Sequence, residues 1–436
     1  MLRLAHDALD PLAGELSVAR RCTDHLFAQV PEASLYERPI PERHRIAFYL
    51  GHLEAFDANL LLREASGALV PPDTLDRLFA FGIDPVGGSL PSDAVADWPP
   101  LRAIHGYAQR TRARVDQWLM RLTDRPIDGI AVATLLQAAI EHRWMHAETL
   151  AYMLNRLARE RPLRTPVTSR RAVEYGDMLS VSAGTVTLGA PRDGSFAWDN
   201  EYCAHTLDVP AFRIDRYMVS NGQYLRFVEA GGYRDARWWT PEDFLWLQRQ
   251  AVQHPAAWSR SLDDWRLWSL QDEIAFQESW PVYVSHAEAS AYARWTGAQL
   301  PEEAQWHRAA YGSPRGPERA YPWGDRAPAP ALGNFDFSRW DPMPVNAHPH
   351  SASAFGVEGL LGNGWEWTST QFAPFAGFDP QPFYPGYSAD FTDGRHYVLK
   401  GGSAHTAQRL LRRSFRNWFQ PHYPYPFAGF RCVRPL

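Results

Sequence analysis

The sequence has little cysteine, no long apolar run and no concentration of positive charge. Its three cysteines, Cys22, Cys203 and Cys432, are odd in number and far apart, which argues against a disulfide framework or a cysteine-rich zinc site. We expect them to be small buried hydrophobic residues. No run of 18 apolar residues occurs, so no membrane-spanning helix is predicted.

Charge and the first residues narrow the class of protein further. The formal net charge is -5, and no block of lysine or arginine occurs, so no nucleic-acid partner is expected. Residues 1–7 lack the charged-then-apolar layout of a secretion signal. These features predict a soluble, cytoplasmic protein without a membrane or nucleic-acid partner, and they predict no particular oligomeric state.

The chain is long and rich in aromatic side chains. Its 436 residues exceed what one hydrophobic core usually organises, so two or three domains are expected. Hydrophobic residues make up 45% of the chain and aromatic residues 13%, which is enough for well-packed cores. Of the 18 tryptophans 14 lie in the second half, with 20 of the 35 prolines, which indicates a loop-rich domain stiffened by aromatic packing.

The first half reads as a helical bundle. Apolar residues recur with a helical period in four segments, residues 12–30, 43–64, 101–122 and 129–159. A crossover rich in proline and glycine, residues 70–100, separates the second from the third, which is typical of a four-helix bundle. Prolines and charges then interrupt the pattern. We expect the bundle at 1–160, a linker at 161–175 and a second domain at 176–436.

The second half mixes strand and helix signals, so we expect an α+β domain. Residues 181–188 and 212–219 alternate like strands. Ser220 and Ser285 are placed to cap helices, the latter over 286–296, and a further helix opens at 301–306. Beyond residue 311 the chain reads mostly as turns, with short strands at 397–400 and 429–433.

Three histidines stand out as candidate metal ligands. His142 and His146 are four residues apart in a helical segment, so they point the same way, on the same stripe as apolar residues. His52 lies on the second segment, on a stripe with Phe48 and Phe56. Three neutral imidazoles on two packed helices would form an open site, with water or substrate completing the shell. Core histidines with no ion are the alternative.

The second half resembles the formylglycine-generating enzyme/sulfatase-modifying-factor domain, a modified C-type-lectin-like fold. The resemblance rests on ordered motifs: ID at 214–215, VSN at 219–221, WTGAQLPEEAQW at 295–306, YPWG at 321–324, GNGWEWT at 362–368, KGGS at 400–403, RSFRN at 413–417 and GFR at 429–431. That family oxidises a sulfatase cysteine with a pair of active-site cysteines. Residues 408–416 contain none, so formylglycine generation is not expected here. The fold also permits a Ca²⁺ ion in this domain.

The first half resembles a DinB-like four-helix bundle, and the fusion resembles the non-heme iron sulfoxide synthases of ergothioneine and ovothiol biosynthesis. His52, His142, His146 and Glu148 match that family's early His followed by HxxxHxE. The resemblance implies that Fe(II) and O2 join a sulfur donor to the imidazole ring of histidine or Nα-trimethylhistidine (hercynine), leaving a sulfoxide. Glu148 would orient a ligand imidazole or cap a neighbour; a solvated helix glutamate is the alternative.

The resemblance also implies that the second domain completes the substrate pocket. Trp418 and Phe419 would contact a trimethylammonium group by cation–π interaction, and Asn417 would supply a polar tip. Arg416, preferred over two neighbouring arginines, would bind a carboxylate with its planar fork. Core packing is the alternative for each aromatic residue.

A redox-active or proton-donating tyrosine is expected near the iron. Tyr387 is our choice, with Tyr384 in reserve. Met145 occupies a position where many ergothioneine-type members have glutamine, so recognition of the acceptor should differ. Members that use γ-glutamylcysteine have an aspartate and an arginine around the positions of Phe419 and Tyr423, and neither is present here, so a γ-glutamyl donor is not expected. Cysteine and a selenosugar, the donor of selenoneine synthases, therefore remain open as donors.

Other functions stay open from the sequence. One is an ovothiol-type 5-histidylcysteine sulfoxide synthase, although that branch usually carries an added methyltransferase domain. A second is a non-catalytic binding or scaffold module whose histidines serve only in the core. A third is a DinB-type thiol transferase, which would prefer zinc and need no O2.

Overall fold

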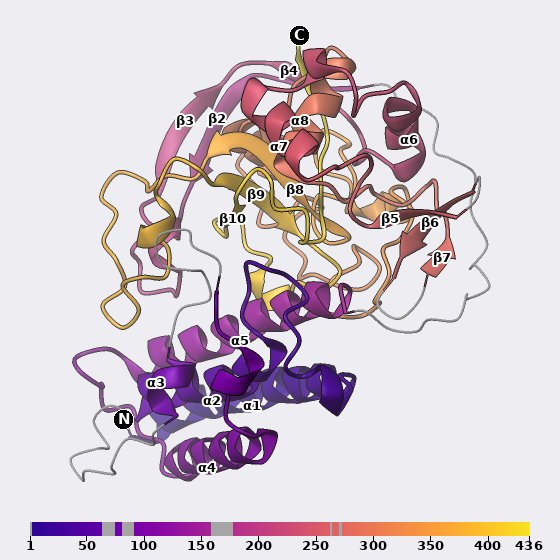
Figure 1. Cartoon of the computed structure of the whole chain (residues 1–436). Coiled ribbons are helices and arrows are strands. Elements are labelled where there is room, and N and C mark those ends of the chain that lie inside the picture. Colours follow the sequence, from indigo (N-terminus) through magenta and orange to yellow (C-terminus); the bar gives the residue numbers. More distant parts are fainter. Residues whose placement is uncertain (1, 63–74, 81–90, 158–177, 262–263, 270–272) are drawn as a thin grey trace. The chain divides into compact units, whose positions relative to one another are not determined.

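The computed structural model separates the chain into two units, Met1–Ala158 and Arg159–Leu436 (Figure 1). It describes residues 2–62, 75–80, 91–157, 178–261, 264–269 and 273–436. The expected linker at 161–175 lies outside the described residues, so the boundaries expected at 160 and 176 stay predictions.

Unit 1 is the expected four-helix bundle. Its helices are α1 (Leu2–Ala28), α2 (Ile46–Leu61), the short α3 (Asp76–Phe79), α4 (Leu101–Leu119) and α5 (Val132–Leu154). Helix α1 packs against α5, and α2 packs against α3, α4 and α5. The sequence places the start of α1 too late, because Pro11 lies inside the helix rather than ahead of it.

Unit 2 combines short helices with four described sheets. The helices are α6 (Asn221–Glu229), α7 (Pro241–Arg249), α8 (His286–Trp295) and α9 (Glu303–Tyr311). The largest sheet has the order β10 (Asn417–Phe419), β9 (Tyr397–Gly402), β8 (Gly364–Gln371) and β11 (Ala428–Gly429). A second sheet has the order β1 (Leu179–Val181), β4 (Phe212–Ile214) and β12 (Val433–Pro435). A third pairs β2 (Gly184–Leu188) with β3 (His205–Val209). The fourth has the order β5 (Trp258–Ser261), β6 (Asp264–Trp268) and β7 (Glu273–Ala275).

Strand pairing in unit 2 is antiparallel except between β11 and β8. The last strand, β12, pairs with β4, so Val433 lies opposite Ile214 and the end of the domain closes on its beginning. The α+β prediction is confirmed. The helix caps are confirmed too, because the Ser220 and Ser285 hydroxyls accept the backbone N–H groups of Gln223 and Glu288.

Several sequence motifs of unit 2 meet in one buried ion pair. Arg431 donates two hydrogen bonds of 2.7 Å to the Glu366 carboxylate, and both side chains are fully buried. The Trp306 indole N–H donates to the same carboxylate at 2.9 Å. The remaining guanidinium N–H groups donate to the carbonyls of Asp215, Arg216 and Glu358. These contacts hold residues from four of the sequence motifs together in the interior of unit 2.

The cysteine prediction holds for one residue only. All three cysteines are free, and Cys432 is buried, but Cys22 and Cys203 are only half-buried. Cys203 lies in a loop where its thiol approaches the carbonyl of Gly377, at 3.8 Å. A loop has no periodic pattern of apolar residues, so the exposure of Cys203 could not be predicted from the sequence.

His405 provides a test of pH dependence in unit 2. Its ring is stacked on Phe427, with Trp340 and Phe337 at its edges, and neither ring nitrogen has a hydrogen-bond partner among the described residues. Burial lowers the His405 pKa to about 3. Between pH 6.5 and about pH 3, only the unfolded chain takes up this proton. The free energy of unfolding therefore decreases as the pH is lowered through this range.

We therefore expect His405→Phe, an apolar ring of similar size, to flatten the pH dependence of unfolding. At pH 5 the variant should be spared about 2 kcal/mol of destabilisation, at 1.36 kcal/mol per pKa unit. Urea unfolding of both proteins between pH 7 and pH 5 measures the difference. Parallel pH profiles would show that His405 is not held neutral.

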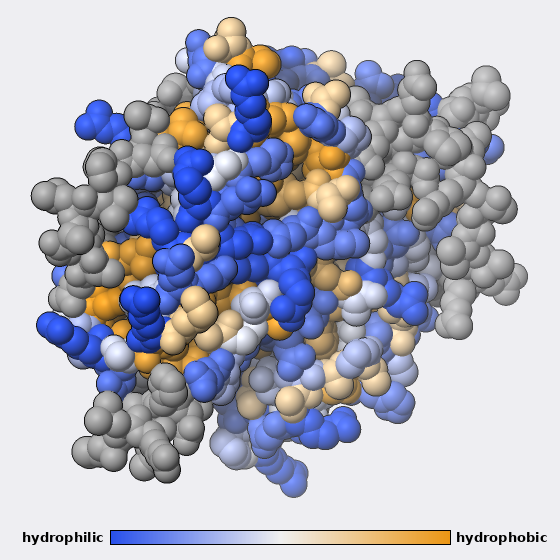
Figure 2. Space-filling model, turned by 90° about the horizontal axis from the view of Figure 1, so that it is seen from below, coloured by the Kyte–Doolittle hydropathy of each residue, from blue (hydrophilic) through white to orange (hydrophobic). Residues whose placement is uncertain are grey.

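Hydrophilic side chains cover most of the face drawn in Figure 2, with smaller hydrophobic areas between them. Among the residues whose exposure is described, the large hydrophobic ones that are exposed are scattered along the chain: Val18, Val95, Met120, Leu207, Leu245, Trp268 and Leu436. Scattered exposure of this kind is normal for a folded domain. Within the described residues, no helix has the length and apolar character needed to cross a bilayer.

Candidate metal centre

His52, His142 and His146 converge inside unit 1. One ring nitrogen of each lies within 4.8 Å of the others, and no side chain is more than 3% exposed. His52 comes from α2, and the other two come from adjacent turns of α5. Across the described ranges this is the one group of three or more histidine, cysteine or acidic side chains arranged to hold an ion.

Aromatic rings fix the orientation of two of these imidazoles. Phe48 stacks on His52 with ring centroids 4.8 Å apart, and Phe56 stacks on His142 at 3.4 Å. Phe48, His52 and Phe56 share one face of α2 because they are spaced by four residues. The stripe predicted from the sequence is therefore present, and it lies against the three histidines.

The carbonyl of Phe79 sets the tautomer of His52. It lies 2.7 Å from Nδ1, which must carry the proton in order to donate to a carbonyl. The other nitrogen, Nε2, is buried and has no partner among the described residues. A histidine that donates one N–H to a carbonyl and leaves the other nitrogen open is the usual arrangement of a metal ligand.

Sequence reasoning missed Phe79, which belongs to α3 inside the expected crossover. Glycine at position 51 is what lets α3 approach. A Cβ there would lie 2.5 Å from the Phe79 ring, well inside contact distance. The one available signal was Gly51 itself, since a glycine within an otherwise apolar helix often marks a close approach.

All three imidazoles are held neutral. Burial lowers the pKa of His52 to about 4, despite its hydrogen bond to Phe79. Burial, followed by the neighbouring imidazoles, also lowers the pKa values of His142 and His146 well below the usual range. Neutral imidazole is the form that binds metal, so the site is ready for an ion at neutral pH.

The geometry of the pair on α5 fits a shared ion. The Nε2 atoms of His142 and His146 are 3.0 Å apart. Two imidazole nitrogens bound to one ion at about 2.1 Å and at a right angle are about 3.0 Å apart. Three histidines without a carboxylate or thiolate suit a transition metal and leave coordination positions for other ligands.

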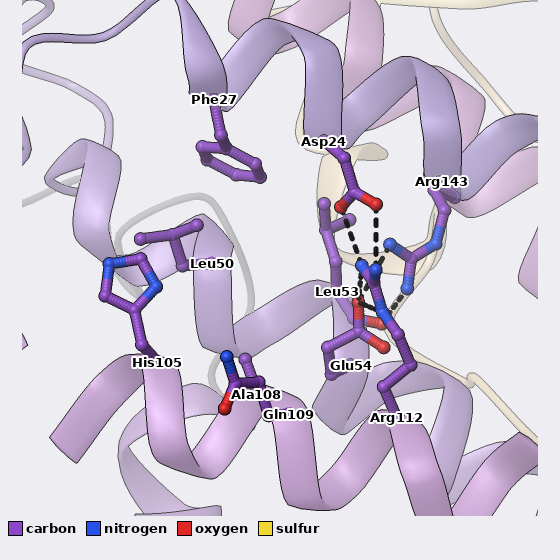
Figure 3. Close-up of a pocket in the computed structure, with 10 residues that line it drawn as sticks. All are labelled: Asp24, Phe27, Leu50, Leu53, Glu54, His105, Ala108, Gln109, Arg112 and Arg143. Atoms are coloured by element: carbon purple, nitrogen blue, oxygen red, sulfur yellow. Dashed lines mark hydrogen bonds and ion pairs between the residues drawn. The ribbon is translucent and has the colours of Figure 1, made fainter. Parts of the chain in front are cut away.

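A pocket of about 220 Å³ lies elsewhere in unit 1, among α1, α2, α4 and α5 (Figure 3). Its lining combines apolar side chains with an ionic cluster: Asp24, Phe27, Leu50, Leu53, Glu54, His105, Ala108, Gln109, Arg112 and Arg143. None of the three converging histidines lines it. Leu53 and Arg143, however, directly follow His52 and His142 in the sequence.

The structure brings some of the predicted catalytic and substrate-binding residues of unit 2 together. Tyr387 is 8% exposed, stacks on Trp198 at 4.1 Å, and meets the ring of Trp418 edge-on at 5.5 Å. Tyr384 lies 5.8 Å from Tyr387. Phe419, by contrast, stacks on Tyr423 at 5.2 Å. Tyr387 and Trp418 thus share one aromatic cluster.

A neighbouring loop holds Tyr387 in place, which the sequence did not suggest. The Ser388 hydroxyl donates to the buried carboxylate of Asp199 at 2.6 Å, next to the stacked Trp198. Residues 198–199 and 387–388 are so far apart in the chain that no local pattern links them.

Arg416 is already paired within unit 2. It is 2% exposed, its Nε lies 3.1 Å from Glu303, and it donates to the carbonyls of Asn200 and Ala373. Asn417 is half-buried and accepts from the backbone N–H of Trp418. The carboxylate-binding role of Arg416 and the polar role of Asn417 stay predictions.

On α5, Met145 is half-buried and lies between His142 and His146 in the sequence, and Glu148 is 8% exposed. The alternative that Glu148 is a solvated helix glutamate is therefore wrong. Its role in orienting an imidazole or capping a neighbour stays a prediction.

Fold and site together define a helical domain with a three-histidine centre joined to a sulfatase-modifying-factor domain. Residues 15–150 match the DinB superfamily, and residues 164–436 match the family described as sulfatase-modifying factor enzyme 1-like domain. The chain belongs to the family of proteins that combine these two domains.

Its relatives include proteins named as hercynine oxygenases and as ergothioneine biosynthesis proteins. The chain is 35% identical to the hercynine oxygenase of Mycolicibacterium smegmatis, over 98% of this chain and 99% of that protein. It is 38% identical to the hercynine oxygenase of Mycobacterium tuberculosis, over 77% and 78%. It is 26% identical to the ergothioneine biosynthesis protein 1 of Neurospora crassa, over 93% of this chain and 56% of that protein.

Proposed function

We propose that this protein is an Fe(II)- and O2-dependent synthase that joins a thiol or selenol donor to the imidazole ring of hercynine, as in ergothioneine biosynthesis. The observation that carries the proposal is the buried, neutral cluster of His52, His142 and His146, in a chain that is 35% identical to a hercynine oxygenase over nearly its whole length. We further propose that it acts in the cytoplasm.

The overall reaction balances with one molecule of O2. A C–S bond replaces one C–H and one S–H bond, one oxygen atom enters the sulfoxide, and the other leaves as water. Iron held by the three imidazoles would supply the reduction of O2 and a common binding point for oxygen and sulfur. The protein must hold the donor sulfur, orient the acceptor ring and deliver or accept protons.

In this proposal the aromatic residues of unit 2 bind the acceptor. Trp418 and Phe419 would attract its trimethylammonium group, Asn417 would bind a polar group, and Arg416 would bind the carboxylate. Arg416 would have to share its guanidinium with Glu303, which it already contacts. Met145 cannot donate a hydrogen bond, so it would contribute only apolar contact to the acceptor ring.

A matched assay of iron-loaded protein tests the function. The full chain would be loaded with Fe(II) without oxygen and then given O2, hercynine and one of three donors: cysteine, γ-glutamylcysteine or a selenosugar. We expect O2 uptake and a product whose mass equals acceptor plus donor plus oxygen, minus two hydrogens. Histidine in place of hercynine tests the ovothiol-type reaction. A zinc-loaded protein that transfers thiols without O2 would contradict the proposal, and so would a protein that takes up no stoichiometric metal.

The donor panel also separates the routes that the sequence leaves open. Phe419 and Tyr423 stack on each other and offer no charge to a γ-glutamyl group. We therefore expect cysteine or the selenosugar to react faster than γ-glutamylcysteine. The fold's capacity for Ca²⁺ in unit 2 can be followed in the same preparations by metal analysis.

We propose that Tyr387 donates or relays a proton in this reaction. Tyr387→Phe keeps the ring that stacks on Trp198 but removes the hydroxyl, so kcat should fall by about 100-fold with little change in thermal stability. Tyr384→Phe, which removes the hydroxyl of the competing candidate, should cost far less. Steady-state kinetics of both variants decide between them, and a larger loss in the Tyr384 variant would transfer the role to that residue.

A further inference from the structure

A single buried arginine ties together the two helices that carry the histidines. Arg143 directly follows His142 on α5 and is 1% exposed. Its Nη2 donates to the backbone carbonyl of Leu53 at 3.0 Å and to the Asp57 carboxylate at 2.7 Å, both on α2. Leu53 directly follows His52. The arginine therefore connects the chain immediately next to one ligand with the chain immediately next to another.

Arg143 is the innermost member of a cluster of arginines and carboxylates. Its Nη1 lies 3.2 Å from Glu54, which also accepts from Arg112 at 2.7 Å. Arg112 in turn binds both carboxylate oxygens of Asp24. Figure 3 shows these four side chains gathered together, with the guanidinium group of Arg112 between the half-exposed Asp24 and Glu54.

The cost of burying this guanidinium indicates that it serves more than stability. Removing an arginine and its partner carboxylates from water is expensive, and apolar side chains of similar volume often stabilise a core as well or better. Apolar contacts between α2 and α5, however, have no preferred direction. The planar fork of an arginine restricts both the distance and the angle of the acceptors that it meets, and in Arg143 the two terminal nitrogens make these contacts.

We propose that Arg143 is a positioning residue of the metal centre: it holds α2 and α5 in the register at which His52 meets His142 and His146. The inference rests on the metal-binding part of the proposed function. Arg143 is not one of the three side chains that are grouped to hold an ion. It acts through the helix backbone, by fixing the position of the Leu53 carbonyl one residue beyond the ligand on α2.

Metal affinity is the decisive measurement, with Co²⁺ as a spectroscopic probe in the full-length protein. Arg143→Met keeps a long apolar side chain but removes the fork. We expect Co²⁺ binding to weaken by about 10- to 100-fold, as for loss of other groups that orient metal ligands. Circular dichroism and the thermal midpoint establish that the variant is folded before its affinity is compared.

Arg20→Met is a matched control. Arg20 is also buried, at 6% exposure, and also pairs with Asp57, at 3.3 Å, but its partners are carboxylates rather than the backbone of α2. Its removal should lower stability and leave the Co²⁺ affinity near that of the wild type. An equal loss of affinity in both variants would show that the cluster acts only through general stability, and this would overturn the proposal.

Arg143→Lys decides the question if the methionine variant does not fold. Lysine keeps the positive charge but, as a point charge, cannot reach the Leu53 carbonyl and both carboxylates with fixed geometry. We expect a partial loss of Co²⁺ affinity, and wild-type affinity in the folded lysine variant would overturn the proposal. A wild-type protein that binds no Co²⁺ would instead contradict the proposed function, and with it this inference.

Discussion

His142→Ala is expected to lose the metal and, with it, the activity. The substitution removes one of three neutral imidazoles and leaves His146 without the nitrogen that lies 3.0 Å away. Outer partners of a ligand are worth about 10- to 100-fold in metal affinity, so loss of a ligand should cost more than about 100-fold. Metal analysis of protein purified without oxygen, followed by the O2 uptake assay, measures both effects.

His105→Ala serves as the control for that experiment. His105 is an exposed histidine of α4 in the same unit and lines the pocket of Figure 3 rather than the three-histidine cluster. Its removal should leave the metal content unchanged. Stoichiometric iron retained by His142→Ala would show that the iron is bound elsewhere.

Arg431→Met is expected to destabilise unit 2 by about 3–5 kcal/mol, which is the usual cost of removing one partner of a buried ion pair. Of the N–H groups that now donate to the Glu366 carboxylate, only the Trp306 indole N–H would remain. Three backbone carbonyls would also lose the guanidinium that they now accept from. Urea unfolding followed by tryptophan fluorescence measures the change.

An exposed pair of the same chemistry provides the comparison. Arg237 also binds Asp235 with two N–H groups, but the arginine side chain is 77% exposed. Water replaces such a contact readily, so Arg237→Met should have a far smaller effect. If the two variants unfold at the same urea concentration, burial does not decide the contribution of these pairs.

The convergence of the three histidines could be predicted because the spacing of residues along a helix determines which way their side chains point. His142 and His146 had to share a face of α5, and the apolar stripe around His52 placed that histidine inside the bundle. What could not be predicted was the acceptor for His52. The Phe79 carbonyl comes from a four-residue helix within a stretch rich in proline and glycine. Such a short helix has no apolar period from which it could be predicted.

The sheets of unit 2 were harder to predict for a different reason. Strand β8 is buried on both faces over residues 364–368, so the alternation that marks a half-buried strand is absent. Strand β4 ends at Ile214, well short of the expected 219. The partner of Arg416 was equally hidden, because Glu303 is distant in sequence and arginines are usually exposed.

The approach of Phe79 to Gly51 bears on how this protein could change through mutation. Alanine at position 51 would alter no ligand and no charge, yet its methyl group would force the Phe79 ring, 2.5 Å away, to shift. The neighbouring carbonyl would then release Nδ1 of His52, and the imidazole could turn or exchange its proton. A search for harmful variants that considers only the three histidines would overlook Gly51, although a single methyl group there would disturb the hydrogen bond that orients His52.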